Sequence, residues 1–293
     1  MRASRGPFKV EVALDAHVCR RPTVEETLAT VAGYGIGAVQ FSLDCVPGLP
    51  ALPDALTQDT RALVRQATAA AAVRLASVSG TYNMAHPDAA HRDAGARRLR
   101  AVIAACPALG ADVVTLCTGT RDTSSMWRPH RDNGSPAAWR DLVASLAAVL
   151  PTAEASGVTL AMEPEVSNVV DSAARARRLM DELGSRHLRV CIDGANLFHE
   201  GELPRMPEIL DEAFDLLGAD IVLAHAKDLD HDGEAGNLPA GHGRLDYPRY
   251  LHLLKDSGFT GAVVLHGLSE AQVDACAAFL AAGIVAAEGT QSG

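Results

Sequence analysis

Four polar residues directly follow four successive apolar runs in the second half of the chain. They are Glu163 after LAM, Asp193 after VCI, His225 after VLA and His266 after VVL. Neighbouring parallel strands lie about 4.8 Å apart, so side chains at equivalent strand ends can converge on one ion. A single residue of this kind would more simply be satisfied by a nearby loop. Four at the same position in consecutive repeats predict a divalent metal site.

The types of these residues also indicate which ion is bound. Mixed carboxylate and imidazole ligands suit Mn²⁺, Co²⁺, Zn²⁺ or Fe²⁺ better than Ca²⁺. We expect Mn²⁺, with Co²⁺, Mg²⁺, Zn²⁺ and Fe²⁺ as alternatives.

Two further titratable residues lie two positions beyond predicted ligands. Glu165 follows Glu163, and Lys227 follows His225. Strand alternation places each on the same side of its strand as the ligand. A metal that polarises a carbonyl acidifies the neighbouring C–H, and Glu163 or Glu165 could remove that proton. Lys227 could stabilise the enediolate charge, or instead form a structural salt bridge with a strand-end acid. Reprotonation elsewhere gives isomerisation or epimerisation, and loss of a β-substituent gives elimination.

Other polar and aromatic side chains near predicted strand ends are candidates for substrate binding. The set consists of His17, Tyr82, Asn83, His86, Trp127, Asn196, His199 and Arg244. Trp127 lies in the long irregular segment Gly119–Gly134, where its ring could stack on a sugar or simply anchor the loop. Asn196 and His199 could reach substrate hydroxyls or brace a loop. The predicted partner is therefore a small polyhydroxy molecule.

The residues that must position this chemistry alternate between short apolar runs and helical segments. Eight runs are predicted strands: Val10–Asp15, Ala38–Leu43, Arg74–Ser79, Val113–Thr118, Thr159–Glu163, Leu188–Asp193, Ile221–His225 and Ala262–His266. Most of the runs are continuously apolar, which is typical of parallel strands buried on both faces.

Helical segments follow the strands. They are Thr23–Tyr34, Thr57–Ala72, Ala89–Leu109, Ser135–Ala155, Asp171–Leu183, Pro207–Leu217, Tyr247–Ser257 and Ser269–Ala282. Several are predicted to end at a glycine, including Gly184, Gly218, Gly258 and Gly283.

Eight strand–helix units in 293 residues average about 37 residues each, as in a (β/α)₈ barrel. A doubly wound sheet would normally have G-x-G-x-x-G after its first strand, and 15–19 reads DAHVC. We therefore predict one α/β TIM barrel domain over residues 1–293. The active site of such a barrel lies at the carboxyl ends of the strands.

Composition restricts the partners and the compartment. The formal net charge of −10 disfavours binding to nucleic acid and to anionic membranes. No apolar run approaches the roughly 20 residues of a membrane span, and the N-terminus lacks the apolar stretch of a signal peptide. The six cysteines are dispersed without a C-x-x-C pair, so we expect buried, reduced thiols and a cytoplasmic location.

The motifs LAMEPE, VCIDGANLFHEG, LAHAKDLD and VVLHG resemble those of the xylose isomerase-like barrels. This superfamily of sugar-phosphate isomerases and epimerases includes ketose 3-epimerases and inosose-processing enzymes, and the resemblance covers nearly the whole chain. It implies a divalent metal held by Glu, Asp, His and Glu on strands five to eight. The first three match Glu163, Asp193 and His225. Relatives are often dimers or tetramers, so a homo-oligomer is also expected.

The fourth position departs from the family pattern, because His266 occupies the place of the strand-eight glutamate. The resemblance implies that the two glutamates of the epimerases are bases on opposite faces of the substrate carbon. His266 can still bind a metal, but it does not supply the second carboxylate. An aldose–ketose isomerase or a one-base lyase remains compatible.

Three other functions are alternatives to an isomerase or epimerase. One is a metal-dependent lyase or dehydratase on the same scaffold, of the dehydroshikimate or C-glycoside-cleaving kind. Another is a catalytically silent binding or partner subunit, which the substitution of the strand-eight glutamate by His266 keeps open. A DNA-repair endonuclease would need more metal ligands and a basic face, so the acidic charge disfavours it.

Overall fold

The structure is a computed structural model that describes residues 10–289. Eight parallel strands close into a barrel, in the order β1-β2-β3-β4-β5-β6-β7-β9, with β9 paired back to β1. They are β1 (Glu11–Asp15), β2 (Ala38–Phe41), β3 (Arg74–Ser79), β4 (Val113–Cys117), β5 (Thr159–Glu163), β6 (Leu188–Asp193), β7 (Ile221–Asp228) and β9 (Ala262–Leu265). The predicted TIM barrel is confirmed. The ends of the predicted domain, 1–9 and 290–293, lie outside the described residues.

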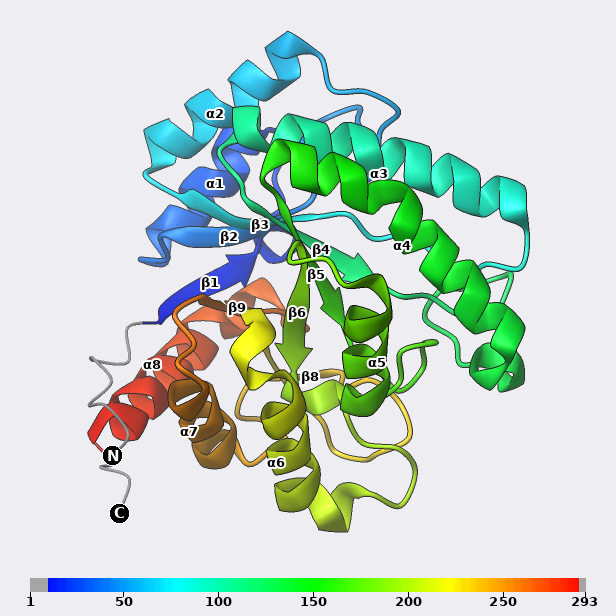
Figure 1. Ribbon diagram of the computed structural model, residues 1–293. Coiled ribbons are helices and arrows are strands. Elements are labelled where there is room, and N and C mark those ends of the chain that lie inside the picture. Colours follow the sequence, from blue (N-terminus) through cyan, green and yellow to red (C-terminus); the bar gives the residue numbers. More distant parts are fainter. Residues whose placement is uncertain (1–9, 290–293) are drawn as a thin grey trace.

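Helices surround the strands, as Figure 1 shows. They are α1 (Val24–Gly33), α2 (Gln58–Ala71), α3 (Ala89–Leu109), α4 (Pro136–Ser156), α5 (Ala173–Leu183), α6 (Met206–Leu217), α7 (Tyr247–Ser257) and α8 (Val273–Gly289). The sequence explains many of their ends. Thr23 and Ser135 accept hydrogen bonds from backbone N–H groups at the starts of α1 and α4. Gly157 and Gly258 adopt the left-handed conformation at the ends of α4 and α7.

One glycine predicted to end a helix, Gly283, does not do so. Helix α8 continues through Gly283 to Gly289. Helix α6 ends at Leu217 with Gly218 as its cap, as predicted, although Gly218 has φ −51° and begins a short 3-10 turn. A Cβ at Gly283 would lie 2.6 Å from Cδ1 of Leu251, and one at Gly218 would lie 3.0 Å from Cβ of Ser257. Both Leu251 and Ser257 belong to α7. Both glycines allow close packing against α7, and Gly218 also caps the end of α6.

Strand β7 runs past its predicted end at His225 to Asp228. Its last residues pair with the short antiparallel strand β8 (Leu238–Pro239), which the sequence patterns did not predict, through Lys227↔Pro239 and Asp228↔Leu238. Asp228 then accepts hydrogen bonds from the backbone N–H groups of Leu229, Gly241, Gly243 and Leu245. This network fixes the loop that follows β7.

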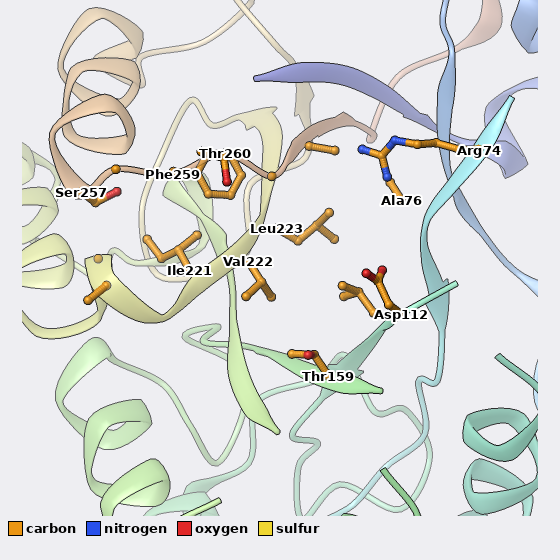
Figure 2. Close-up of a pocket in the computed structure, with 16 residues that line it drawn as sticks. Arg74, Ala76, Asp112, Thr159, Ile221, Val222, Leu223, Ser257, Phe259 and Thr260 are labelled. Atoms are coloured by element: carbon orange, nitrogen blue, oxygen red, sulfur yellow. The ribbon is translucent and has the colours of Figure 1, made fainter. Parts of the chain in front are cut away.

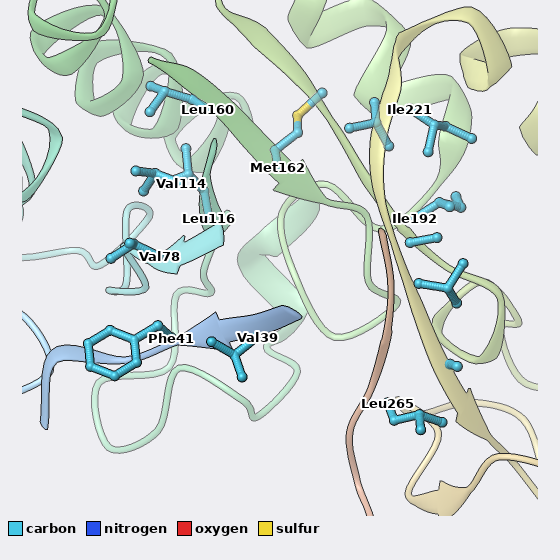
Figure 3. Packing of buried hydrophobic residues seen from close by; sticks show 14 of the residues in the cluster. Val39, Phe41, Val78, Val114, Leu116, Leu160, Met162, Ile192, Ile221 and Leu265 are labelled. Carbon is cyan, nitrogen blue, oxygen red and sulfur yellow. The ribbon is translucent and has the colours of Figure 1, made fainter. Parts of the chain in front are cut away.

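The strands carry two apolar layers. Large side chains such as Val39, Phe41, Met162 and Ile192 point outward to the helices, as Figure 3 shows. A separate cluster, which contains small residues such as Ala38 and Ala161, fills the inside of the barrel. Alternation places Gln40 on the inner face with Ala38, and Glu163 with Ala161. Polar side chains at the carboxyl ends of the strands therefore converge above this inner layer.

Helix α8 is more apolar than a surface helix usually is. The segment Glu270–Gly289 is long and apolar enough to cross a membrane by length and composition, and 28% of its most apolar window is buried. The prediction that no apolar segment approaches the length of a membrane span is therefore wrong for this segment. Helix α8 nevertheless packs against α7, β1 and β9, which is the place of the last helix in a barrel.

Candidate active site

Three of the four predicted metal ligands come together at the carboxyl ends of β6, β7 and β9. Donor atoms of Asp193, His225 and His266 all lie within 4.8 Å of one another. Nε2 of His266 is 3.3 Å from Oδ2 of Asp193, and Nδ1 of His225 is 3.9 Å from the same oxygen. The two imidazole rings are tilted, with centroids 4.3 Å apart.

Glu163, the fourth predicted ligand, adjoins this group at the end of β5. Its Oε1 lies 3.2 Å from Nδ1 of His225 and accepts a hydrogen bond of 2.8 Å from Nδ2 of Asn196. The donors that face one another are therefore Glu163 Oε1, Asp193 Oδ2, His225 Nδ1 and His266 Nε2. Two carboxylate oxygens and two imidazole nitrogens fit a divalent transition metal.

Asp193 is the most enclosed member of the site. It is fully buried, and its Oδ1 accepts the backbone N–H of Ala195 at 2.9 Å. Its Oδ2 also forms a salt bridge of 3.3 Å with Nζ of Lys227. Burial would raise the pKa of this carboxyl group, but Lys227 and then His266 outweigh it and hold the pKa well below its usual range. Asp193 is therefore ionised and suited to bind a cation.

The two histidines differ in their electrostatic surroundings. Burial and the neighbouring His225 lower the pKa of His266, which keeps its imidazole neutral and able to bind a metal. Burial would also lower the pKa of His225, but Cys191 and Glu163 outweigh it and raise that pKa well above its usual value. His225 therefore carries a proton between its neighbours until a cation displaces it.

Lys227 and Glu165 complete the buried charged group. Lys227 is 7% exposed, and Glu165 is 5% exposed. Burial lowers the pKa of Lys227, but Asp193 and Glu163 raise it more, so the lysine is charged. Burial and then the Glu163 carboxylate raise the pKa of Glu165 to about 7. The site thus combines a fixed cation with a carboxyl group that can exist in either protonation state near neutrality.

Of the predicted substrate-binding residues, Asn196 is the one that directly contacts this group. Besides its bond to Glu163, its Oδ1 accepts the N–H of Gly236 at 3.1 Å, so it ties two loops to the site. His199 is half-buried, and its backbone N–H donates a hydrogen bond of 2.9 Å to Oε2 of Glu202.

The predicted residues after β3 have structural contacts. The ring of Tyr82 packs against Gly95 of α3. Oδ1 of Asn83 accepts backbone N–H groups of Ala85 and Thr120, which joins the loops after β3 and β4. His86 stacks on His91 with ring centroids 4.1 Å apart.

Three remaining predicted residues lie on the surface. Trp127 is 58% exposed, and Arg244 is exposed with a 3.5 Å bond to the carbonyl of Asp230. His17 lies between two carboxylates, with Nε2 at 2.8 Å from Asp44 and Nδ1 at 3.4 Å from Asp15. The bond to Asp15 is the largest cause that raises the pKa of His17 to about 9.

A second group of possible donors, His17, Asp44 and Cys45, fits a metal poorly. Both nitrogens of His17 already face carboxylates, and burial raises the pKa of the Cys45 thiol to about 12. The thiol therefore keeps its proton at neutral pH, whereas a metal requires the thiolate. All six cysteines are free and buried, as predicted.

The sequence patterns missed Gln40, which lies inside the barrel on β2. Its Oε1 is 3.0 Å from Nε2 of His225. A lone polar residue within the apolar run AVQF, on the inner face, is the signal that could have identified it.

A cavity of about 390 Å³ lies at the opposite end of the barrel, at the starts of the strands. Figure 2 shows Arg74, Asp112, Ile221 and Phe259 around it. It contains none of the candidate residues. In barrels of this type catalysis takes place at the other end, where the charged group lies.

Known structures share this architecture. A D-tagatose 3-epimerase-like protein aligns with a TM-score of 0.75 and 14% identity, over 95% of this chain and 98% of that one. An L-ribulose 3-epimerase aligns with a TM-score of 0.72 and 18% identity, over 95% of both chains. A xylose isomerase-like TIM barrel protein from Mycobacterium smegmatis, in complex with magnesium, aligns with a TM-score of 0.71 and 15% identity, over 96% of this chain and 98% of that one.

These identities are low, so the structural likeness by itself establishes the fold. The sequence establishes the family, because the model of the xylose isomerase-like TIM barrel matches residues 28–281. The expected resemblance is thereby confirmed: this chain belongs to the xylose isomerase-like TIM barrel family.

Proposed function

We propose that this protein is a divalent-metal-dependent isomerase or epimerase of polyhydroxy carbonyl compounds, and that it works by abstraction of a proton next to the carbonyl. The observation that carries the proposal is the convergence of Glu163, Asp193, His225 and His266 donor atoms at the carboxyl ends of neighbouring strands. Their chemistry fits Mn²⁺, Co²⁺, Zn²⁺ or Fe²⁺, with Mn²⁺ as our choice, and a related structure contains magnesium.

A metal bound by these four residues would supply Lewis acidity toward the carbonyl and hydroxyl oxygens of the substrate. The protein then has to move the proton. Glu163 is engaged by His225 and Asn196, whereas Glu165 is buried with a pKa of about 7. A carboxyl group with a pKa near the working pH can both take and return a proton, so we assign the base to Glu165.

Lys227 would stabilise the negative charge that develops on the substrate when the proton leaves. It is charged and buried beside Asp193, and a low-dielectric site strengthens its effect. Asn196 would hold the Glu163 carboxylate in place. His266 stands where the family resemblance implies a second glutamate. One carboxylate base therefore favours isomerisation, in which the same residue removes a proton from one carbon and returns it to the neighbouring carbon. Epimerisation would need a second proton donor on the opposite face of the substrate.

The L-ribulose 3-epimerase and the D-tagatose 3-epimerase-like protein among the similar structures support a sugar as the substrate class. Six free, buried cysteines are compatible with a reducing compartment, and we propose a cytoplasmic enzyme.

The test is a metal-dependent activity screen. Chelator-treated protein would be supplied with Mn²⁺, Co²⁺ or Mg²⁺ and offered free ketoses, aldoses, inososes and their phosphates. We expect an isomeric or epimeric product that requires added metal. A product with new conjugated absorbance would instead identify a lyase. A protein that binds no stoichiometric divalent metal and gains no activity from Mn²⁺ would contradict the proposal and favour a silent binding subunit.

A further inference from the structure

Gln40 makes a contact that crosses the inside of the barrel. It belongs to β2, whereas its partner His225 belongs to β7, and β1 and β9 separate these strands in the barrel order. Gln40 Oε1 lies 3.0 Å from Nε2 of His225. The Oγ of Ser77 on β3 donates to the same oxygen at 3.4 Å. Two donors therefore point at this amide oxygen.

This arrangement fixes which nitrogen of His225 carries a proton. An amide oxygen can only accept, so the proton of the shared bond belongs to Nε2. In the neutral imidazole, the lone pair is then on Nδ1. Nδ1 is the nitrogen that faces Glu163 Oε1 at 3.2 Å and Asp193 Oδ2 at 3.9 Å. When the proton of His225 on this side is displaced, the lone pair of Nδ1 thus points toward the other donors of the site.

We propose that Gln40 is a positioning residue that assigns Nδ1 of His225 to the metal and fixes the orientation of the ring. The inference rests on the proposed function, since it requires that the four donors hold a metal. Gln40 itself binds neither metal nor substrate in this account. With its amide reversed, it would donate to Nε2, and the remaining proton would sit on Nδ1, between the ring and the carboxylates.

The neighbours of Gln40 in β2 determine which face of the strand it occupies. Val39 and Phe41 are fully buried in the outer apolar layer, so β2 cannot rotate Gln40 away from the barrel interior without exposing them. Gln40 is therefore kept on the inner face of the barrel, where Ser77 Oγ and His225 Nε2 contact its amide oxygen.

The test measures metal binding and stability together. Metal-free wild type and the variants Gln40→Met, Gln40→Glu and Gln66→Met would be titrated with Co²⁺, and affinity read from calorimetry and the visible spectrum. Gln40→Met keeps the shape without the acceptor, and Gln40→Glu keeps an acceptor oxygen. Gln66 lies exposed on α2 and serves as the matched control. Thermal unfolding of each metal-free protein reports any general damage.

Partners of this kind on metal-bound histidines typically contribute about 10–100-fold to metal affinity. We expect Gln40→Met to lose Co²⁺ affinity within that range, while Gln40→Glu and Gln66→Met retain it and the thermal midpoints stay close to wild type. If Gln40→Met does not fold, Gln40→Asn, which withdraws the amide from His225, should give the same loss.

Three other results would overturn the inference about Gln40, and one of them would also overturn the proposed function. Wild-type affinity in folded Gln40→Met or Gln40→Asn would overturn the inference and leave the proposed function intact. An equal loss in Gln40→Met and Gln40→Glu would also overturn it, because packing rather than the acceptor would then matter. A wild-type protein that binds no Co²⁺ would overturn the proposed function and the inference together.

Discussion

His266 Nε2 lies 3.3 Å from Oδ2 of Asp193, the carboxylate oxygen that also receives Lys227. Its imidazole, kept neutral by burial and by His225, occupies the fourth corner of the candidate metal site, where the family resemblance implies a glutamate. In the proposed metal site, His266 would supply a ligand while removing one negative charge, which would make the site more Lewis acidic.

The first prediction concerns His266 as a ligand. We expect His266→Ala to weaken Mn²⁺ or Co²⁺ binding at least about tenfold, because even partners outside the coordination sphere contribute about 10–100-fold. His266→Glu should bind a metal, since a carboxylate can take the same place. Calorimetric titration of metal-free proteins measures both. If His266→Ala binds metal as wild type does, His266 is not a ligand.

The second prediction separates the base from the ligands. Glu165→Gln removes the proton acceptor but none of the four metal donors. General acid–base catalysis contributes about 10²–10⁴-fold, and we expect kcat to fall by that amount. Metal affinity, measured by the same titration, should not change. Unaltered kcat in this variant would move the base to another residue.

The third prediction concerns the buried pair of Lys227 and Asp193. Removal of one partner leaves a buried charge uncompensated, so Lys227→Met should lower the free energy of unfolding of metal-free protein by about 3–5 kcal/mol. The double variant Lys227→Met/Asp193→Asn removes both charges and should be less destabilised than the single one. Urea unfolding provides the comparison. Equal stability of the single and double variants would contradict the expected cost of an uncompensated Asp193 charge.

The fourth prediction is a pH dependence of stability at the barrel rim. The pKa of His17 is raised to about 9 in the folded protein, above its usual 6.5. Its stabilising contribution is therefore complete below about pH 6.5 and lost as the pH rises through about 9. The side chain is 43% exposed, so solvent screening limits the contribution to about 1 kcal/mol or less.

His17→Gln checks this sign. The difference in free energy of unfolding between wild type and variant should be largest near pH 6 and vanish near pH 10, by urea titration at each pH. A difference that grows with pH would show that His17 is not the imidazolium between Asp15 and Asp44.

The fifth prediction tests the packing at the starts of the strands. A Cβ at Gly261 would collide with the carbonyl oxygen of Val222 and lie 2.7 Å from the ring of Phe259. We expect Gly261→Ala to destabilise the protein by about 1–3 kcal/mol. Gly33→Ala is the control, since nothing lies within 4 Å of its added Cβ and alanine favours a helix by about 0.5–1 kcal/mol. Thermal unfolding that ranks the two variants the other way would contradict this packing.

The sequence was sufficient for the barrel and for most of the charged group. Glu163, Asp193 and His225 could be placed together because each ends an apolar run, and equivalent ends of parallel strands meet. The bond between Gln40 and His225 could not be predicted, since it joins two strands that are not neighbours. The prediction that Gly283 ends a helix was wrong for a related reason. The residue is packed against Leu251 of another helix, and a local sequence pattern contains no information about that contact.

The most direct measurement of the central claim is solvent deuterium incorporation, followed by NMR, during turnover of the best substrate in D₂O. Proton abstraction by Glu165 predicts deuterium at the carbon next to the carbonyl in the product, only with divalent metal present and strongly reduced in Glu165→Gln. An isomeric product that forms at the full rate without any solvent deuterium would contradict the account, because hydrogen would then move directly between substrate carbons.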